Sequence, residues 1–113
     1  MALSIATRQL DGVTILDLSG RITLGEGSVQ LRETVRDLVA KGQKKIVLNL
    51  GEVNYMDSSG VGELVTAYTT VKNQGGELKL VNLTKKIEDL MAITKLATVF
   101  DIHNDEASAI AAF

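Results

Sequence analysis

The residues best suited to chemistry lie between positions 55 and 64, where the sequence reads YMDSSGVGEL. Asp57 stands directly before two hydroxyl side chains, Ser58 and Ser59, and two spaced glycines follow. A carboxylate and two hydroxyls at the start of a helix can cap that helix, supply a nucleophile, cradle a phosphate or receive a covalent modification. Four roles therefore compete at one junction, between a strand-like run and a helix-like run.

Helix capping is the simplest of the four roles. The side-chain oxygens of Asp and Ser accept hydrogen bonds from free N–H groups in the first turn of a helix. We expect Asp57, Ser58 or Ser59 to cap the helix that follows, with Ser59 as the preferred residue. A cap uses only one of these side chains, so capping leaves the rest of the motif unexplained. Gly60 and Gly62 would let other backbone or a partner approach closely.

A catalytic serine would need a base, and His103 is the only histidine of the chain. We expect His103 to be an exposed or half-buried residue at a strand end, since nothing marks a nucleophile, base and orienting residue. Residues 57–62 also differ from the Gly-x-Ser-x-Gly elbow of hydrolases. No lysine directly follows Gly60 or Gly62, as a P-loop would require. Modification by another enzyme needs only an exposed serine at a helix N-terminus, with neighbouring residues that the enzyme can recognise.

Composition narrows the classes of function. The chain has 113 residues, which fit one domain, and its net charge of −2 gives no basic surface for nucleic acid or anionic membrane. With no cysteine and one histidine, disulfides, thiolate catalysis and Cys-based or multi-His metal sites within the chain are excluded. The sequence shows neither a long apolar span nor a signal-peptide pattern at its start, so we expect a cytoplasmic location.

Strand-like and helix-like segments alternate along the chain. Two strand-like runs, residues 3–10 and 12–20, flank Asp11-Gly12, a dipeptide typical of β-hairpins. Both faces of the second run are partly apolar, which favours a strand inside a sheet. Further strands are expected at 44–50, 78–81 and 98–102, and helices from Ser28 to Gly42, around 61–71, at 84–96 and at 105–113. Ser28 and Thr84 are the expected N-caps.

The resulting order is β-β-α-β-α-β-α-β-α. Strands that alternate with helices need crossover connections, so most neighbouring strands should be parallel. We expect a single α/β domain with a mixed, mostly parallel sheet and helices packed mainly on one side. The motif at 55–64 would then lie near the carboxyl ends of the strands, where sites in such sheets usually occur.

The central block of the chain, residues 44–83, closely resembles the anti-sigma factor antagonists, the small STAS-domain proteins of bacterial partner switching. The likeness rests on MDSSGVG after the IVLNL strand and on GGELKLVN downstream, and it extends to TILDLSGRI near the start. The resemblance implies one STAS domain over residues 1–113.

The resemblance also implies roles for individual residues. Ser58 matches the phosphoacceptor of the family, which a cognate anti-sigma serine kinase phosphorylates and a serine phosphatase restores. The unphosphorylated protein binds the kinase and so releases the sigma factor. Asp57, Ser59, Gly60 and Gly62 match the rest of the partner-binding motif. ATP and magnesium belong to the kinase, so this chain should need no cofactor and should not be an enzyme.

The loop at residues 20–27, GRITLGEG, resembles the family's strand-to-helix loop beside the acceptor. We therefore expect Arg21 and Thr23 to contact the partner, although a lone arginine is also typical of a solvated surface. At least one of Tyr55 and Met56 should pack in the core. A monomer is the favoured state.

Three alternatives stay open. The chain could serve a partner switch with a different output, such as secretion, motility or a signalling complex. It could be a small enzyme that uses Ser58 or Ser59 as its nucleophile. It could also be a STAS domain that binds a nucleotide or a lipid, although the absence of a basic loop disfavours a nucleotide.

Overall fold

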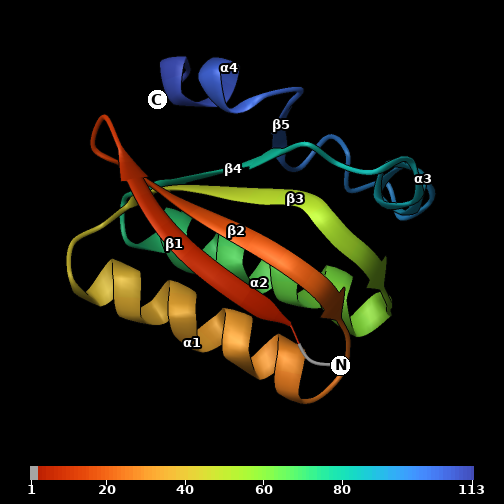
Figure 1. Cartoon of the computed structure of the whole chain (residues 1–113). Helices are drawn as coiled ribbons and strands as arrows, with labels where there is room; N and C mark the ends of the chain where they lie inside the picture. The colour runs from red at the N-terminus through yellow and green to blue at the C-terminus, as the bar shows by residue number, and fades with distance from the viewer. Residues whose placement is uncertain (1–2) are drawn as a thin grey trace.

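Strands and helices alternate in the computed structural model, which describes residues 3–113 (Figure 1). The elements are β1 (Ser4–Leu10), β2 (Val13–Ile22), α1 (Glu26–Ala40), β3 (Lys45–Met56), α2 (Ser58–Asn73), β4 (Glu77–Val81), α3 (Lys85–Ile93), β5 (Asp101–His103) and α4 (Glu106–Ala111). This is the predicted order. Met1 and Ala2, with which the predicted domain begins, lie outside the described residues.

The sheet has five strands in the order β1-β2-β3-β4-β5. β1 and β2 are antiparallel and every later pair is parallel, which confirms the mixed, mostly parallel sheet. Asp11 and Gly12 form the predicted hairpin turn, with φ values of 54° and 79°. β2 lies between two strands, and its residues 13–16 are all buried, as its two apolar faces indicate.

Helices cover the two faces of the sheet unequally. The main core packs residues of α1, α2 and α3 against one face, with Leu31, Leu64 and Ile87 almost fully buried. A small cluster around Val47 and Ala109 packs the short α4 on the opposite face. Figure 1 shows α1 and α2 below the sheet and α4 above it. The prediction that helices lie mainly on one side is confirmed.

The helix boundaries confirm two predicted signals and contradict one. Thr84 caps α3 by accepting a hydrogen bond from the Ile87 amide, and Gly42 follows the end of α1 with a φ of 84°. Ser28 is not the N-cap of α1. Gly25, with a φ of 99°, lets the chain enter the helix earlier, and the Ser28 hydroxyl donates instead to the Thr23 carbonyl at 2.7 Å.

Two strands also differ in length from their predicted ranges. β5 is only three residues long, because residues 98–100 form a turn that places Phe100 in the core. β3 continues from Lys45 through Met56, so the strand leads directly into the motif. In the part of the chain that the structure describes, no helix is both long enough and apolar enough to span a bilayer.

Candidate functional site

The motif occupies the junction between β3 and α2. β3 ends at Met56, Asp57 follows, and α2 begins at Ser58. Met56 pairs with Ile22, the last residue of β2, so both strands end side by side. The loop that follows β2 therefore lies against the start of α2, at the carboxyl edge of the sheet where the sequence predicted a site.

Asp57 is the N-cap of α2. Its backbone is extended, with φ −98° and ψ −175°, and its Oδ1 accepts a hydrogen bond from the Gly60 amide at 2.8 Å. Its Oδ2 accepts from the Leu24 amide at 3.3 Å. The prediction that one motif residue caps the helix is confirmed, but the preference for Ser59 was wrong. A carboxylate can bond the helix and the neighbouring loop together, because each oxygen is an acceptor.

These backbone amides, that of Gly60 above all, hold the pKa of Asp57 below the usual value for a carboxyl group. Asp57 is consequently ionised at neutral pH and places a negative charge beside Ser58. Its oxygens already accept backbone hydrogen bonds, and a lowered pKa makes it a weak base. The geometry therefore suits a structural role, in which Asp57 holds the start of α2 and the loop after β2 together.

The two serines have different surroundings. Ser58 is exposed and is the first residue of α2, where backbone N–H groups and the positive end of the helix dipole favour an anion. Ser59 is half-buried and lines a groove between α1 and α2. Of the two hydroxyls, that of Ser58 is the more accessible to another protein.

The two motif glycines also differ. A Cβ on Gly60 would overlap the carbonyl oxygen of Ile22 and the side chain of Met56, so the predicted close approach of backbone is confirmed there. A Cβ on Gly62 would have no neighbour within 4 Å. Gly62 therefore leaves open space on the surface of α2, and its role toward a partner stays a prediction.

Arg21 and Tyr55 form a cross-strand pair beside the motif. The guanidinium carbon of Arg21 lies 4.8 Å from the centre of the Tyr55 ring, so Arg21 is stacked on an aromatic side chain. Met56 is buried and Tyr55 is 40% exposed, which confirms that one of the two packs in the core. Thr23 is half-buried, and its carbonyl accepts from Ser28. Partner contacts of Arg21 and Thr23 stay predictions.

The sequence reasoning missed a partly buried ion pair that involves a residue of the motif, Glu63. Arg32 of α1 donates to both carboxylate oxygens of Glu63 in α2, at 2.9 and 3.1 Å, and Glu63 is only 8% exposed. Arg32 therefore compensates the negative charge that Glu63 would otherwise add near Ser58. The pair lines a groove of about 460 Å³ that Leu24 and Val29 also line. The only signal of this pair in the sequence was Glu63, an acidic residue at a helix position that faces the core.

His103 is far from the motif. It is the half-buried last residue of β5, as predicted, and its Nε2 lies 3.0 Å from Oδ1 of Asp101. His103 aligns with Val81 of β4, which aligns with Asn49 of β3. The strand between Asn49 and Asp57 spans roughly 20 Å or more at about 3.3 Å per residue. The structure therefore does not bring His103 to Ser58 and Ser59, and these residues do not form a triad with it.

Known proteins are similar to this chain in sequence and in fold. The family model of the STAS domain matches residues 4–109. The chain is similar to the anti-sigma-B factor antagonist of Bacillus subtilis (strain 168), with 34% identity over 102 residues, or 90% of this chain and 92% of that protein.

Solved structures agree at the level of the fold. The crystal structure of the Thermotoga maritima protein TM1081 matches with a TM-score of 0.87 at 26% identity, covering 95% of this chain and 92% of that one. The Bacillus cell fate determinant SpoIIAA in its phosphorylated form matches with a TM-score of 0.73 at 17% identity, over 97% of this chain and 100% of that one. This chain belongs to the STAS domain family, and within it to the anti-sigma factor antagonists.

Proposed function

We propose that the chain is the phosphorylatable member of a bacterial partner switch, with Ser58 as the phosphoacceptor. In its unphosphorylated form it binds a cognate anti-sigma factor serine kinase, which then releases a sigma factor. Phosphorylation of Ser58 by that kinase ends the binding, and a serine phosphatase restores it. The observation that carries the proposal is the position of Ser58, exposed at the first residue of α2 and next to the clamped carboxylate of Asp57.

The first turn of α2 is suited to a phosphate. Phosphorylation adds about −1.5 to −2 charges at neutral pH, and free N–H groups with the helix dipole stabilise such a charge. Asp57 already holds both the loop and the helix, so the fold need not change. This supports a switch by local charge and volume, without refolding.

The same phosphate on Ser58 would weaken the binding of a partner protein. A surface that fits a neutral hydroxyl would meet a dianion beside the ionised Asp57. A penalty of roughly 3 kcal/mol would lower the affinity about a hundredfold. Leu24 and Val29, 78% and 40% exposed, offer apolar contact area near the acceptor. Exposed apolar side chains beside a charge switch support a protein partner over a small substrate.

Relatives support the class of partner. The Bacillus subtilis relative is named for its antagonism of an anti-sigma-B factor. SpoIIAA, which shares the fold, has been solved in unphosphorylated and phosphorylated forms. Both names favour an anti-sigma factor as the partner of this chain and phosphorylation as the switch.

The test uses the isolated kinase, identified by pull-down with the wild-type protein. Binding is measured by calorimetry for wild type, Ser58→Ala and Ser58→Asp, with Ser59→Ala as the matched neighbour. We expect the two alanine variants to bind as wild type does and Ser58→Asp to bind about a hundredfold more weakly. Incubation with ATP should place one phosphate on Ser58. Undiminished binding of Ser58→Asp, or phosphate on Ser59 alone, would contradict the proposal.

A further inference from the structure

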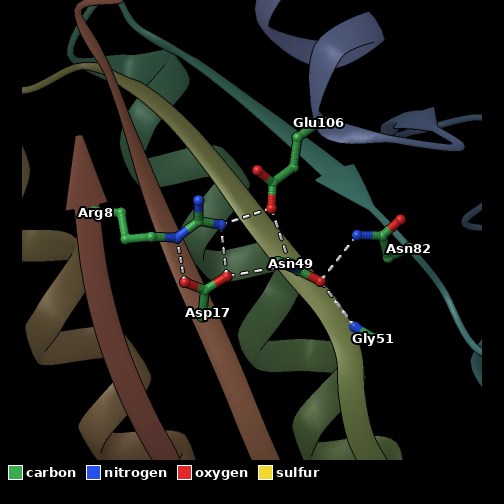
Figure 2. Close-up of polar contacts among 6 residues, drawn as sticks. All are labelled: Arg8, Asp17, Asn49, Gly51, Asn82 and Glu106. Carbon is green, nitrogen blue, oxygen red and sulfur yellow. Dashed lines mark hydrogen bonds and ion pairs between the residues drawn. The ribbon is translucent and has the colours of Figure 1, made fainter. Parts of the chain in front are cut away.

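Asn49 lies at the centre of a polar network on the face of the sheet that α4 covers (Figure 2). Its Nδ2 donates to Oδ1 of Asp17 and to Oε2 of Glu106, both at 3.1 Å. Its Oδ1 accepts from the Gly51 amide at 3.0 Å and from Nδ2 of Asn82 at 3.3 Å. A side-chain amide has two N–H donors and two acceptor positions, so these partners use its full capacity.

The network coincides with an irregularity in β3. Asp17 of β2 aligns with Asn49, and Ser19 aligns with Glu52, so β3 carries one extra residue over this stretch. Such a β-bulge bends its strand and changes the direction of the residues beyond it. A Cβ on Gly51 would lie 3.2 Å from Oδ1 of Asn49, so a glycine fits the tight turn of chain beneath that amide.

Beyond the bulge, β3 loses one of its two neighbours. Its register with β4 ends where Asn49 aligns with Val81, whereas its pairing with β2 continues to Met56 through a second irregularity between Val53 and Tyr55. Figure 1 shows β3 curving away from β4 toward the start of α2. The course of residues 52–56, which lead into Asp57 and Ser58, therefore depends on β2, on the two irregularities and on the packing of Val53 and Met56 in the core.

The C-terminal helix reaches this bulge through one side chain. Glu106, the first residue of α4, lies 57 positions from Asn49 in sequence and also accepts from Nη2 of Arg8 at 2.6 Å. Arg8 binds both oxygens of Asp17, at 2.6 and 2.9 Å, and its single positive charge offsets part of the negative charge of the two acids. Without Glu106, one Nδ2 hydrogen of Asn49 would lose its partner and the amide could turn away from Gly51.

We propose that Asn49 is a positioning residue: together with Glu106 it fixes the β3 bulge, and it thereby couples the docking of α4 to the segment that carries Ser58. The coupling between α4 and the bulge requires no partner protein. Its consequence, that α4 tunes how well Ser58 is presented to a kinase, rests on the proposed function.

Amide hydrogen exchange, followed by NMR on the full chain, tests the coupling without any partner. Glu106→Ala should speed exchange of the Gly51 amide about fivefold, the effect of one hydrogen bond, and should shift the amide resonances of residues 52–60. Glu33→Ala removes an exposed acid of α1 and should change neither. Phe113, two residues beyond the end of α4, packs under the ammonium group of Lys79; Phe113→Ala removes this contact but keeps Glu106, so it should have a smaller effect than Glu106→Ala.

A double-mutant cycle separates coupling from general loosening. If Glu106 acts through Asn49, Glu106→Ala should add almost nothing to the exchange rate of Gly51 when Asn49 is already alanine. Additive effects of the two substitutions, or a Gly51 amide that exchanges equally fast in wild type and Glu106→Ala, would overturn the proposal.

The isolated kinase provides a second measurement with a separate meaning. Ser58 should be phosphorylated several-fold more slowly in Glu106→Ala than in wild type, although Glu106 lies on the far face of the sheet. Equal rates would refute the tuning of Ser58. A wild-type chain that accepts no phosphate would instead refute the proposed function, and the exchange rates would still decide the coupling.

Discussion

The Oδ2 atom of Asp57 accepts a hydrogen bond from the backbone amide of Leu24, 33 positions earlier in the chain. The other oxygen of the same carboxylate caps α2 through the Gly60 amide. Asp57 thus joins the loop after β2 to the first turn of α2, and the two segments flank Ser58. The carboxylate holds both segments in place beside Ser58, which is exposed.

Replacing Asp57 by alanine should both destabilise α2 and release the loop. Loss of an N-cap should lower Tm by on the order of 5 °C in calorimetry. The Leu24 amide should also exchange faster. Thr84→Ala is the matched control, because Thr84 caps α3 through the Ile87 amide and holds no loop at the motif. An unchanged Leu24 exchange rate in Asp57→Ala would show that the second hydrogen bond is not formed in solution.

The contribution of Asp57 to the stability of the fold should also depend on pH. The pKa of Asp57 is lowered in the folded protein, chiefly by the Gly60 amide, so its ionised form stabilises the fold. That stabilisation is fully present above the unfolded pKa of about 3.9 and is lost as the pH falls through the lower folded value. Urea unfolding should show wild type more stable than Asp57→Asn at pH 7, with the difference shrinking below about pH 4. A difference that stays constant down to about pH 2 would contradict this.

The two motif glycines form a matched pair for testing the close packing of α2. Gly60→Ala places a methyl group against the Ile22 carbonyl and should lower the free energy of unfolding by about 2 kcal/mol or more. Gly62→Ala enters open space within the helix and should raise it by about 0.5–1 kcal/mol. Urea titrations measure both. Similar losses for the two variants would mean that the helix start is not packed as described.

Much of this fold could be predicted from local patterns. The Asp11-Gly12 turn, the two apolar faces of β2 and the Thr84 cap depend on residues close in sequence, so periodicity and turn chemistry were sufficient. The choice between Asp57 and Ser59 as cap could not be made this way. It depends on the Leu24 amide, which β2 brings to the motif from a distant part of the chain.

In the candidate site, too, the local features could be predicted and the long-range contacts could not. The type of residue at Ser58 and its place at a helix start were readable from the motif. The Arg32–Glu63 pair joins residues 31 positions apart, and the partners of Asn49 beyond its own strand come from β2, from α4 and from the loop after β4. Contacts across that separation depend on helix packing and strand register, which hydrophobic periodicity alone does not determine.

The exposed side chain of Leu24 should matter for binding and not for folding. Leu24 and Ile93 are both 78% exposed, but only Leu24 is tied to the motif through Asp57. Leu24→Ser should therefore leave Tm unchanged within error and weaken binding of the isolated kinase about tenfold, as loss of an apolar anchor does. Ile93→Ser removes an equally exposed apolar side chain from α3 and should alter neither quantity. If the two variants bound equally well, the partner would have to approach Ser58 without using the loop that Asp57 holds.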